Sequence, residues 1–116
     1  MVKRRLIVVV SPKIRLRPGL CTVVPLSTKQ PEPVMPYHCE INLNPAPPEP
    51  WGDKTRWVKG DMICAVAFHR LDFLRLGKNN EGRRIYRYDL LSPEDLRRVR
   101  ACVLASLGLA ALTKHL

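Results

Sequence analysis

The sequence predicts a mainly β fold, a small barrel or partly open sheet with one C-terminal α-helix packed on it. Three observations support this prediction. Five short segments are rich in β-branched and aromatic residues, a longer segment near the end repeats apolar residues at helical spacing, and turn-forming residues separate them. The chain has 116 residues, which suits one hydrophobic core, so we expect residues 1–116 to form a single domain.

The first two predicted strands form a hairpin. Residues 5–11 (RLIVVVS) are a β-branched run that ends at Ser-Pro and is too short for a helix, so we expect a buried strand. A basic connection with a Pro-Gly turn at 18–19 leads to the second strand, residues 20–26. Pro25 cannot donate a ladder hydrogen bond, and it therefore predicts an edge position or a strand end.

Three more strands are expected further along the chain. Residues 37–43 alternate in polarity, residues 62–68 (MICAVAF) predict a buried strand, and residues 83–90 predict the strand that closes the sheet. Residues 44–52 hold four prolines in nine positions, which excludes regular structure and predicts an exposed loop. The segment GKNNEG at 77–82 predicts a hairpin turn.

The last predicted element is a helix over residues 93–107. Ser92 is placed as its N-cap, Pro93 at the first helical position, and acidic residues follow in the first turn. Its apolar stripe consists of Leu96, Val99, Cys102, Val103 and Leu107. We expect Arg97, Arg98 and Arg100 to form a solvated face and Gly108 to end the helix.

The charge of the chain indicates a polyanionic partner. Lys and Arg number 20 against 10 acidic residues, a formal net charge of +10, and no acidic residue precedes Glu32. Such a field attracts nucleic acid or an acidic protein, although a solvated basic face that keeps the protein soluble is the alternative. No apolar run is long enough to span a bilayer and no secretion signal is evident, so we expect a cytoplasmic protein.

Metal and cofactor chemistry find little support. The four cysteines are dispersed, and Cys21, Cys64 and Cys102 stand in apolar stretches, where we expect buried free thiols rather than a disulfide framework. A zinc site made from His38, Cys39, Cys64 and His69 is conceivable, but no close pair of ligands supports it. Without a GxGxxG, P-loop or HExxH motif, we expect no metal and no cofactor.

A series of motifs follows one order along most of the chain. They are Arg5-Leu-Ile-Val-Val-Val-Ser-Pro12, Gly19 followed by a strand ending in Pro25-Leu-Ser-Thr28, Tyr37-His-Cys-Glu-Ile41, His69-Arg-Leu-Asp-Phe73 with Arg75-Leu-Gly77, and Leu91-Ser-Pro-Glu-Asp-Leu96. In this order and content the chain resembles the PemK/MazF toxins of type II toxin–antitoxin systems. It departs from the family pattern at Leu6, where the family has proline, at Val66-Ala67, where it has Asp-Gln, and at His69, where it has arginine. The family's usual first strand has no counterpart, so we expect a divergent member whose Met1 is an internal start or a trimmed end.

The resemblance implies an SH3-like barrel of the CcdB/PemK type that forms a homodimer and binds an acidic antitoxin. It also implies a metal-independent endoribonuclease, or mRNA interferase, in which the ribose 2′-hydroxyl of single-stranded RNA attacks the neighbouring phosphate. That reaction needs a base, an acid and a cation for the developing negative charge. By the resemblance, the catalytic residues are Arg5, Ser27, His69 and Asp72, and the substrate-binding residues are Arg15, Arg17, Thr28, Lys29 and Arg70.

Each of these residues also has a structural interpretation, and the activity has two competitors. Arg5 can be a surface residue at a strand end, Ser27 and Thr28 can cap a turn, Asp72 can pair with an arginine, and His69 can be structural. A barrel of this family can bind a protein target without nuclease chemistry, as the related CcdB toxins bind gyrase. A module that binds nucleic acid without cutting it is the third possibility.

Overall fold

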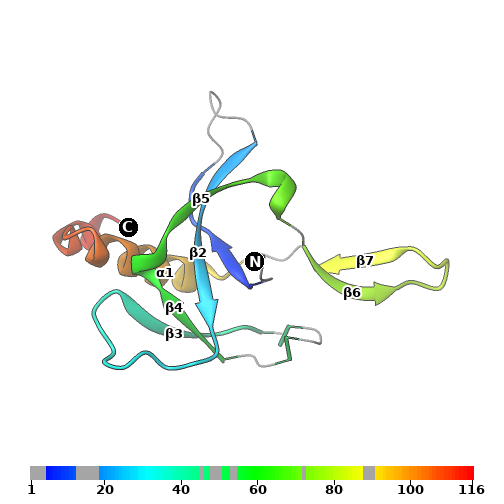
Figure 1. Ribbon diagram of the computed structural model, residues 1–116, viewed down its shortest axis with the longest axis horizontal. Coiled ribbons are helices and arrows are strands. Elements are labelled where there is room, and N and C mark those ends of the chain that lie inside the picture. Colours follow the sequence, from blue (N-terminus) through cyan, green and yellow to red (C-terminus); the bar gives the residue numbers. More distant parts are fainter. Residues whose placement is uncertain are drawn as a thin grey trace.

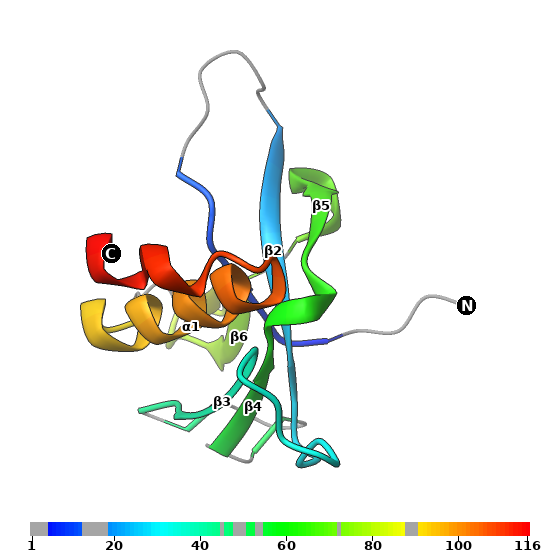
Figure 2. The same ribbon diagram turned by 90° about the vertical axis from the view of Figure 1, so that its left-hand side faces the viewer.

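The computed structural model describes residues 5–12, 19–44, 46–47, 51–52, 55–71, 73–87 and 91–116. Its main sheet is antiparallel, with the strand order β1-β2-β4-β3 and with β5 also paired to β2. The C-terminal helix packs on one face of this sheet, and a separate hairpin, β6–β7, projects away from it (Figures 1 and 2). The described part of the protein is thus mainly antiparallel β with one α-helix at the C-terminal end, the predicted fold class, and its sheet does not close into a barrel.

The first hairpin joins β1 (Ile7–Val9) to β2 (Leu20–Ser27) in the predicted antiparallel arrangement, with Ile7 opposite Pro25 and Val9 opposite Val23. The prediction of a wholly buried first strand is wrong. Leu6 and Val8 are buried, whereas Val9 is 45% exposed, because alternate side chains of β1 point to opposite faces of the sheet and only one face covers the core here.

On its other side β2 meets two strands in succession. Val58 of β4 (Thr55–Lys59) lies opposite Leu26, and Cys64 of β5 (Cys64–Ala67) lies opposite Val23. From Val23 to Leu26 there are three residue steps, whereas from Val58 to Cys64 there are six. The 3₁₀ turn η1 (Gly60–Met62) supplies the three extra residues and interrupts the ladder.

This interruption corrects the prediction for Pro25. The proline lies inside the central strand, neither at an edge nor at a strand end. The amide of Leu26 points to β1, where it donates to the Leu6 carbonyl at 3.0 Å, so the nitrogen of Pro25 points to the opposite side, between the β5 and β4 pairings. A donor is not needed there, because η1 breaks the ladder at that point.

β4 was not predicted, and the segment after it was predicted wrongly. Residues 57–61 were expected only to lead into a strand at 62–68, yet residues 55–59 form β4 and pair along their whole length with β3 (His38–Asn42). Residues 60–62 form η1, so β5 begins only at Cys64. β5 is not buried either. Cys64 and Ala65 are exposed, although the run is apolar.

The last two strands, β6 (Leu74–Lys78) and β7 (Arg84–Arg87), form their own two-stranded sheet. β6 was not predicted. The expected closing strand pairs with β6 and not with the described strands of the main sheet. The side-chain oxygen of Asn79 holds the turn between them by accepting from the amides of Glu81 (2.9 Å) and Arg83 (3.0 Å).

Helix α1 (Pro93–Ser106) has the predicted boundaries to within one residue. Ser92 Oγ accepts from the amide of Asp95 at 3.1 Å, which confirms the N-cap. Gly108 adopts a positive φ of 75°, and the amides of Gly108 and Leu109 return to the carbonyls of Ala105 and Leu104, so the helix ends in a Schellman motif.

The apolar stripe of α1 reaches the core through Val99 and Cys102, while Leu107 is 58% exposed and therefore does not belong to it. The core between helix and sheet consists of Leu6, Val8, Val24, Leu26, Ile41, Leu43, Val58, Val99 and Cys102. The predicted solvated arginine face is only partly observed, because Arg100 is half-buried and its Nη2 donates to the Val10 carbonyl at 3.3 Å. The 3₁₀ segment η3 (Ala110–His115) follows and folds back along α1 (Figure 2).

Candidate functional site

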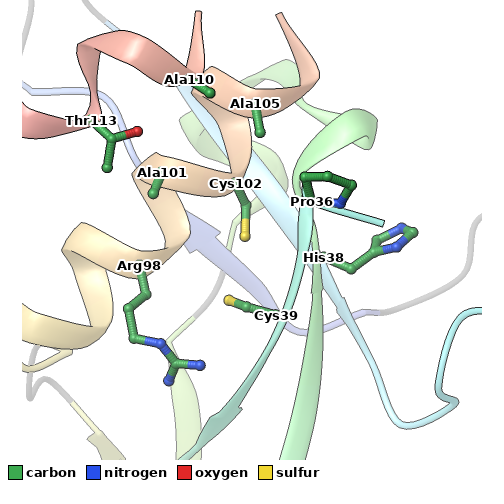
Figure 3. A pocket seen from close by; sticks show the side chains of 9 residues that line it. All are labelled: Pro36, His38, Cys39, Arg98, Ala101, Cys102, Ala105, Ala110 and Thr113. Atoms are coloured by element: carbon green, nitrogen blue, oxygen red, sulfur yellow. The ribbon is translucent and has the colours of Figure 1, made fainter. Parts of the chain in front are cut away.

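The part of the chain that the structure describes has two surfaces that could bind a ligand. One is a pocket of about 340 Å³ between β3, α1 and η3, on the helix side of the sheet (Figure 3). It is lined by Pro36, His38, Cys39, Arg98, Ala101, Cys102, Ala105, Ala110 and Thr113, and none of the residues that the sequence predicted for RNA chemistry is among them. The other surface is the sheet face away from the core.

A row of side chains crosses that face at the Ser27 end of β2. Ser27 lies opposite Trp57 on β4, and Trp57 lies opposite Glu40 on β3. On the other side, the bond from the Leu26 amide to the Leu6 carbonyl extends the β1–β2 register by one pair, and the same register continued by one more step would set Arg5 opposite Ser27. Directly opposed residues of an antiparallel sheet share a face, so Arg5, Ser27, Trp57 and Glu40 stand in one line.

The burial of the residues next to this row shows which face of the sheet carries it. Leu6, Leu26 and Val58, the neighbours of these residues along the strands, are all buried in the core. Alternation along a strand then directs the row of Arg5, Ser27 and Trp57 away from the core. Arg5 and Glu40 are indeed exposed, and Ser27 and Trp57 are half-buried.

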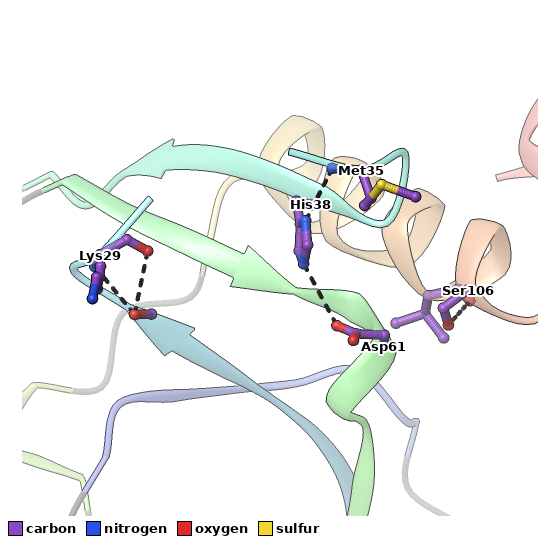
Figure 4. Close-up of polar contacts among 7 residues, drawn as sticks. Lys29, Met35, His38, Asp61 and Ser106 are labelled. Carbon is purple, nitrogen blue, oxygen red and sulfur yellow. Dashed lines mark hydrogen bonds and ion pairs between the residues drawn. The ribbon is translucent and has the colours of Figure 1, made fainter. Parts of the chain in front are cut away.

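Ser27 caps a turn, one of its two predicted roles. Its Oγ accepts a hydrogen bond from the amide of Lys29 at 3.1 Å and contacts the Lys29 carbonyl at 3.5 Å (Figure 4). The cap holds the exposed side chains of Thr28 and Lys29 next to the row. A hydroxyl has two acceptor lone pairs and one proton, so this role leaves Ser27 with hydrogen-bonding capacity toward a ligand.

The structure does not bring His69 and Arg70 to this row. Both lie in the 3₁₀ turn η2 (Phe68–Arg70), directly after Ala67, which pairs with Leu20, and the amide of Phe68 donates to the Gly19 carbonyl at 2.7 Å. Leu20 and Ser27 are the two ends of β2, seven residue steps or about 23 Å apart at the usual rise of a strand. His69 is exposed and too distant to share one phosphate with Arg5 and Ser27.

Three other predicted site residues, Arg15, Arg17 and Asp72, lie outside the described residues. Comparison with known protein families provides independent evidence of the family to which the chain belongs. The family model described as PemK-like, MazF-like toxin of type II toxin–antitoxin system matches residues 1–107. The chain belongs to this family. A search of curated proteins finds no match to it.

Sequence reasoning missed two features of this PemK-like toxin. Trp57 was not a predicted site residue, because its place beside Ser27 follows from the pairing of β2 with β4 and from no motif. The second feature is the contact between His38 and Asp61, whose Nε2 and Oδ1 atoms are 3.7 Å apart. His38 Nδ1 accepts from the amide of Met35 at 3.1 Å, so the ring is fixed at both nitrogens (Figure 4).

Neither feature of the toxin indicates a metal. Among the residues that the structure describes, no group of three or more His, Cys, Asp or Glu side chains is placed to hold a metal ion. The four cysteines are free thiols, and Cys64 is exposed, which corrects the expectation that it is a buried hydrophobe. No described helix is both long enough and apolar enough to cross a bilayer.

Proposed function

We propose that this PemK-like toxin is a metal-independent endoribonuclease that binds single-stranded RNA across the row of Arg5, Ser27 and Trp57. The observation that supports the proposal is the register, which pairs Ser27 with Trp57 and, continued past Ile7, would set Arg5 opposite Ser27 on the sheet face away from the core. The row combines a guanidinium suited to bidentate phosphate contact, a hydroxyl, and an aromatic ring on which an unstacked base can lie. The net charge of +10 supports binding of a polyanion.

The roles follow from this arrangement and from the family resemblance. Arg5 binds the scissile phosphate and stabilises the charge that develops on it, and Ser27 orients a phosphate oxygen. Asp72 takes the proton of the 2′-hydroxyl, whose oxygen attacks phosphorus and displaces the 5′-oxygen of the next nucleotide, which leaves with a proton taken from water. The products are a 2′,3′-cyclic phosphate and a 5′-hydroxyl.

The remaining predicted site residues contact the flanking RNA. Thr28 and Lys29 follow the row directly, and we assign them to the phosphate next to the cut. Because η2 is about 23 Å away along β2, we assign His69 and Arg70 to nucleotides further along the strand rather than to proton transfer. Arg15 and Arg17 complete the basic surface in the proposal.

A toxin of a type II toxin–antitoxin system has an antitoxin as its partner. We propose that this antitoxin is acidic and that residues 1–116 act as one toxin domain in the cytoplasm, where thiols stay reduced. We also propose a homodimer. Leu107, Leu109, Leu112 and Leu116 at the C-terminal end are all more than 40% exposed, and a subunit interface would cover such side chains.

Incubation of the purified chain with a long single-stranded RNA in EDTA tests the proposal. We expect the native chain to cleave the RNA and Arg5→Ala to cleave it at least about 100-fold more slowly. Arg83→Ala, on the exposed turn of the β6–β7 hairpin, is the matched control and should cut at the native rate. RNA binding without cleavage would favour a binding module, and failure to bind RNA at all would favour a protein target.

A further inference from the structure

Two free thiols meet where the sheet contacts the helix. Cys39 projects from β3 and Cys102 from α1, and their side chains point toward one another (Figure 3). The thiol of Cys102 is hydrogen-bonded to the sulfur of Cys39. Arg98 precedes Cys102 by four residues, one helical turn, and its guanidinium lines the same pocket.

The surroundings divide the two thiols into a reactive and a protected one. The hydrogen bond from Cys102 and the charge of Arg98 hold the pKa of the Cys39 thiol below its usual value, against the opposing effects of burial and of Asp95. The same hydrogen bond and burial raise the pKa of Cys102. Cys39 therefore has the larger thiolate fraction at neutral pH, and the thiolate is the nucleophile.

Other charges near Cys39 are few. Among the residues that the structure describes, the titratable and charged groups near it are Arg98, Asp95 and Cys102 from α1, and His38 from its own strand lines the same pocket. From β4 it meets the apolar Val58, which lies opposite it in the sheet, and η3 contributes the neutral Thr113 to the pocket. Arg98 is shared with Asp95, whose Oδ1 lies 3.8 Å from its Nη1.

The solvent accessibility of the two thiols matches their difference in reactivity. Cys39 is half-buried and lines the pocket, whose walls include the small side chains of Ala101 and Ala105. The pocket volume of about 340 Å³ exceeds by about tenfold the roughly 30 Å³ that a water molecule occupies, so a small peroxide can enter. Cys102 also lines the pocket but is only 4% exposed.

We propose that Cys39 and Cys102 form a peroxide-sensitive modification site. The Cys39 thiolate attacks one oxygen of hydrogen peroxide, the O–O bond breaks, and Cys39 sulfenic acid and hydroxide form. The sulfur of Cys102 then attacks the sulfenic sulfur and displaces its oxygen, which leaves as water with the Cys102 proton. The two sulfurs are oxidised, the peroxide is reduced, and the resulting disulfide ties α1 to β3.

The chain contains a competing pair, Cys21 and Cys64. Cys21 lies opposite Val66 and Cys64 lies opposite Val23, so the two cysteines are diagonal neighbours on β2 and β5. Diagonal positions of a sheet are roughly 7–8 Å apart, whereas a disulfide needs Cβ atoms about 3.5–4.5 Å apart. This pair should therefore stay reduced under conditions that link Cys39 to Cys102.

The direct test treats the folded, full-length chain with a small molar excess of hydrogen peroxide and maps its peptides by mass spectrometry without reduction. We expect a linked pair of peptides that contains Cys39 and Cys102, and its loss when the chain is unfolded in urea before oxidation. A Cys21–Cys64 link as the main product, or no link between Cys39 and Cys102, would overturn the proposal.

Three variants separate the thiol chemistry from a structural effect. In Cys102→Ser, a sulfenic-acid trap such as dimedone should label Cys39, because the resolving thiol is absent; Cys64→Ser, on an exposed strand position, should form the native link. Arg98→Gln should lower the alkylation rate of Cys39 several-fold at pH 7 but leave it unchanged at a pH where the thiol is fully ionised. Equal effects at both pH values would rule out the assigned role of Arg98.

Discussion

Gly60 lies directly against the backbone of Cys102. A Cβ atom added at Gly60 would stand 2.7 Å from the carbonyl carbon of Cys102 and 2.8 Å from its carbonyl oxygen and its Cβ. Its own amide donates to the Tyr37 carbonyl at 2.9 Å. The turn η1, which interrupts the ladder between β4 and β5, is thus also the place where α1 packs on the sheet. Only glycine lets the helix approach it this closely.

Gly60→Ala should destabilise the protein by about 1–3 kcal/mol, because the backbone of α1 must move away from the sheet. Urea unfolding followed by circular dichroism measures the change. Removing the Cys102 sulfur as well, in Gly60→Ala/Cys102→Ala, should not restore stability, because all three close atoms, the backbone C and O and the Cβ, remain in alanine. Full recovery in the double variant would show that the sulfur sets the spacing.

Trp57→Ala should weaken binding of single-stranded RNA by about tenfold or more, since stacking of one base on an aromatic ring contributes about 1–3 kcal/mol. Trp57→Phe keeps a ring opposite Ser27 and should retain most of the affinity. Fluorescence anisotropy with a labelled RNA at fixed salt provides the dissociation constants. Native affinity in Trp57→Ala, with native unfolding behaviour, would remove Trp57 from the interface.

Ser92→Ala should lower the free energy of unfolding by about 1 kcal/mol, because the amide of Asp95 loses the acceptor that caps the helix. Ser92→Asp supplies another oxygen acceptor and should have close to native stability. Chemical denaturation of the three proteins at one pH makes the comparison. Equal losses in both variants would contradict the cap.

The stability of the native chain relative to Cys21→Ala should depend on pH. Burial, and then the nearby Cys64, raise the pKa of the Cys21 thiol above its ordinary value of 9.0. The unfolded chain then loses this proton first, so the contribution of Cys21 is fully present below about pH 9 and declines as pH rises further. Urea unfolding of both proteins between pH 7 and 10.5 under reducing conditions should show their difference shrinking above pH 9, and a constant difference would contradict it.

Much of the fold was predictable because local signals agreed with the final packing. The valine run before Ser11, the alternation after Tyr37, and the capping residues around Pro93 each specify their element without reference to the rest of the chain. β4 and η1 were missed because the sequence from Trp57 to Phe68 predicts a lead-in followed by a single strand. In the structure, contact with α1 at Gly60 divides this segment. Tertiary packing decides such a division.

The site was predictable only where motif and register coincide. Arg5 and Ser27 come from separate motifs, and the β1–β2 pairing joins them. Trp57 carries no motif and becomes visible only through its cross-strand neighbour. His69 was grouped with Arg5 because of its motif, and the sequence contains no signal that η2 follows the opposite end of β2.

We propose that the Arg5–Ser27–Trp57 row directs attack of a ribose 2′-hydroxyl on the adjacent phosphate. Analysis of the ends of RNA cut by the native chain in EDTA, beside Arg5→Ala and the control Arg83→Ala, tests it most directly. We predict 2′,3′-cyclic phosphate and 5′-hydroxyl ends, produced equally by the control and about 100-fold more slowly by Arg5→Ala. Ends with 3′-hydroxyl and 5′-phosphate groups, or undiminished cleavage by Arg5→Ala, would contradict the claim.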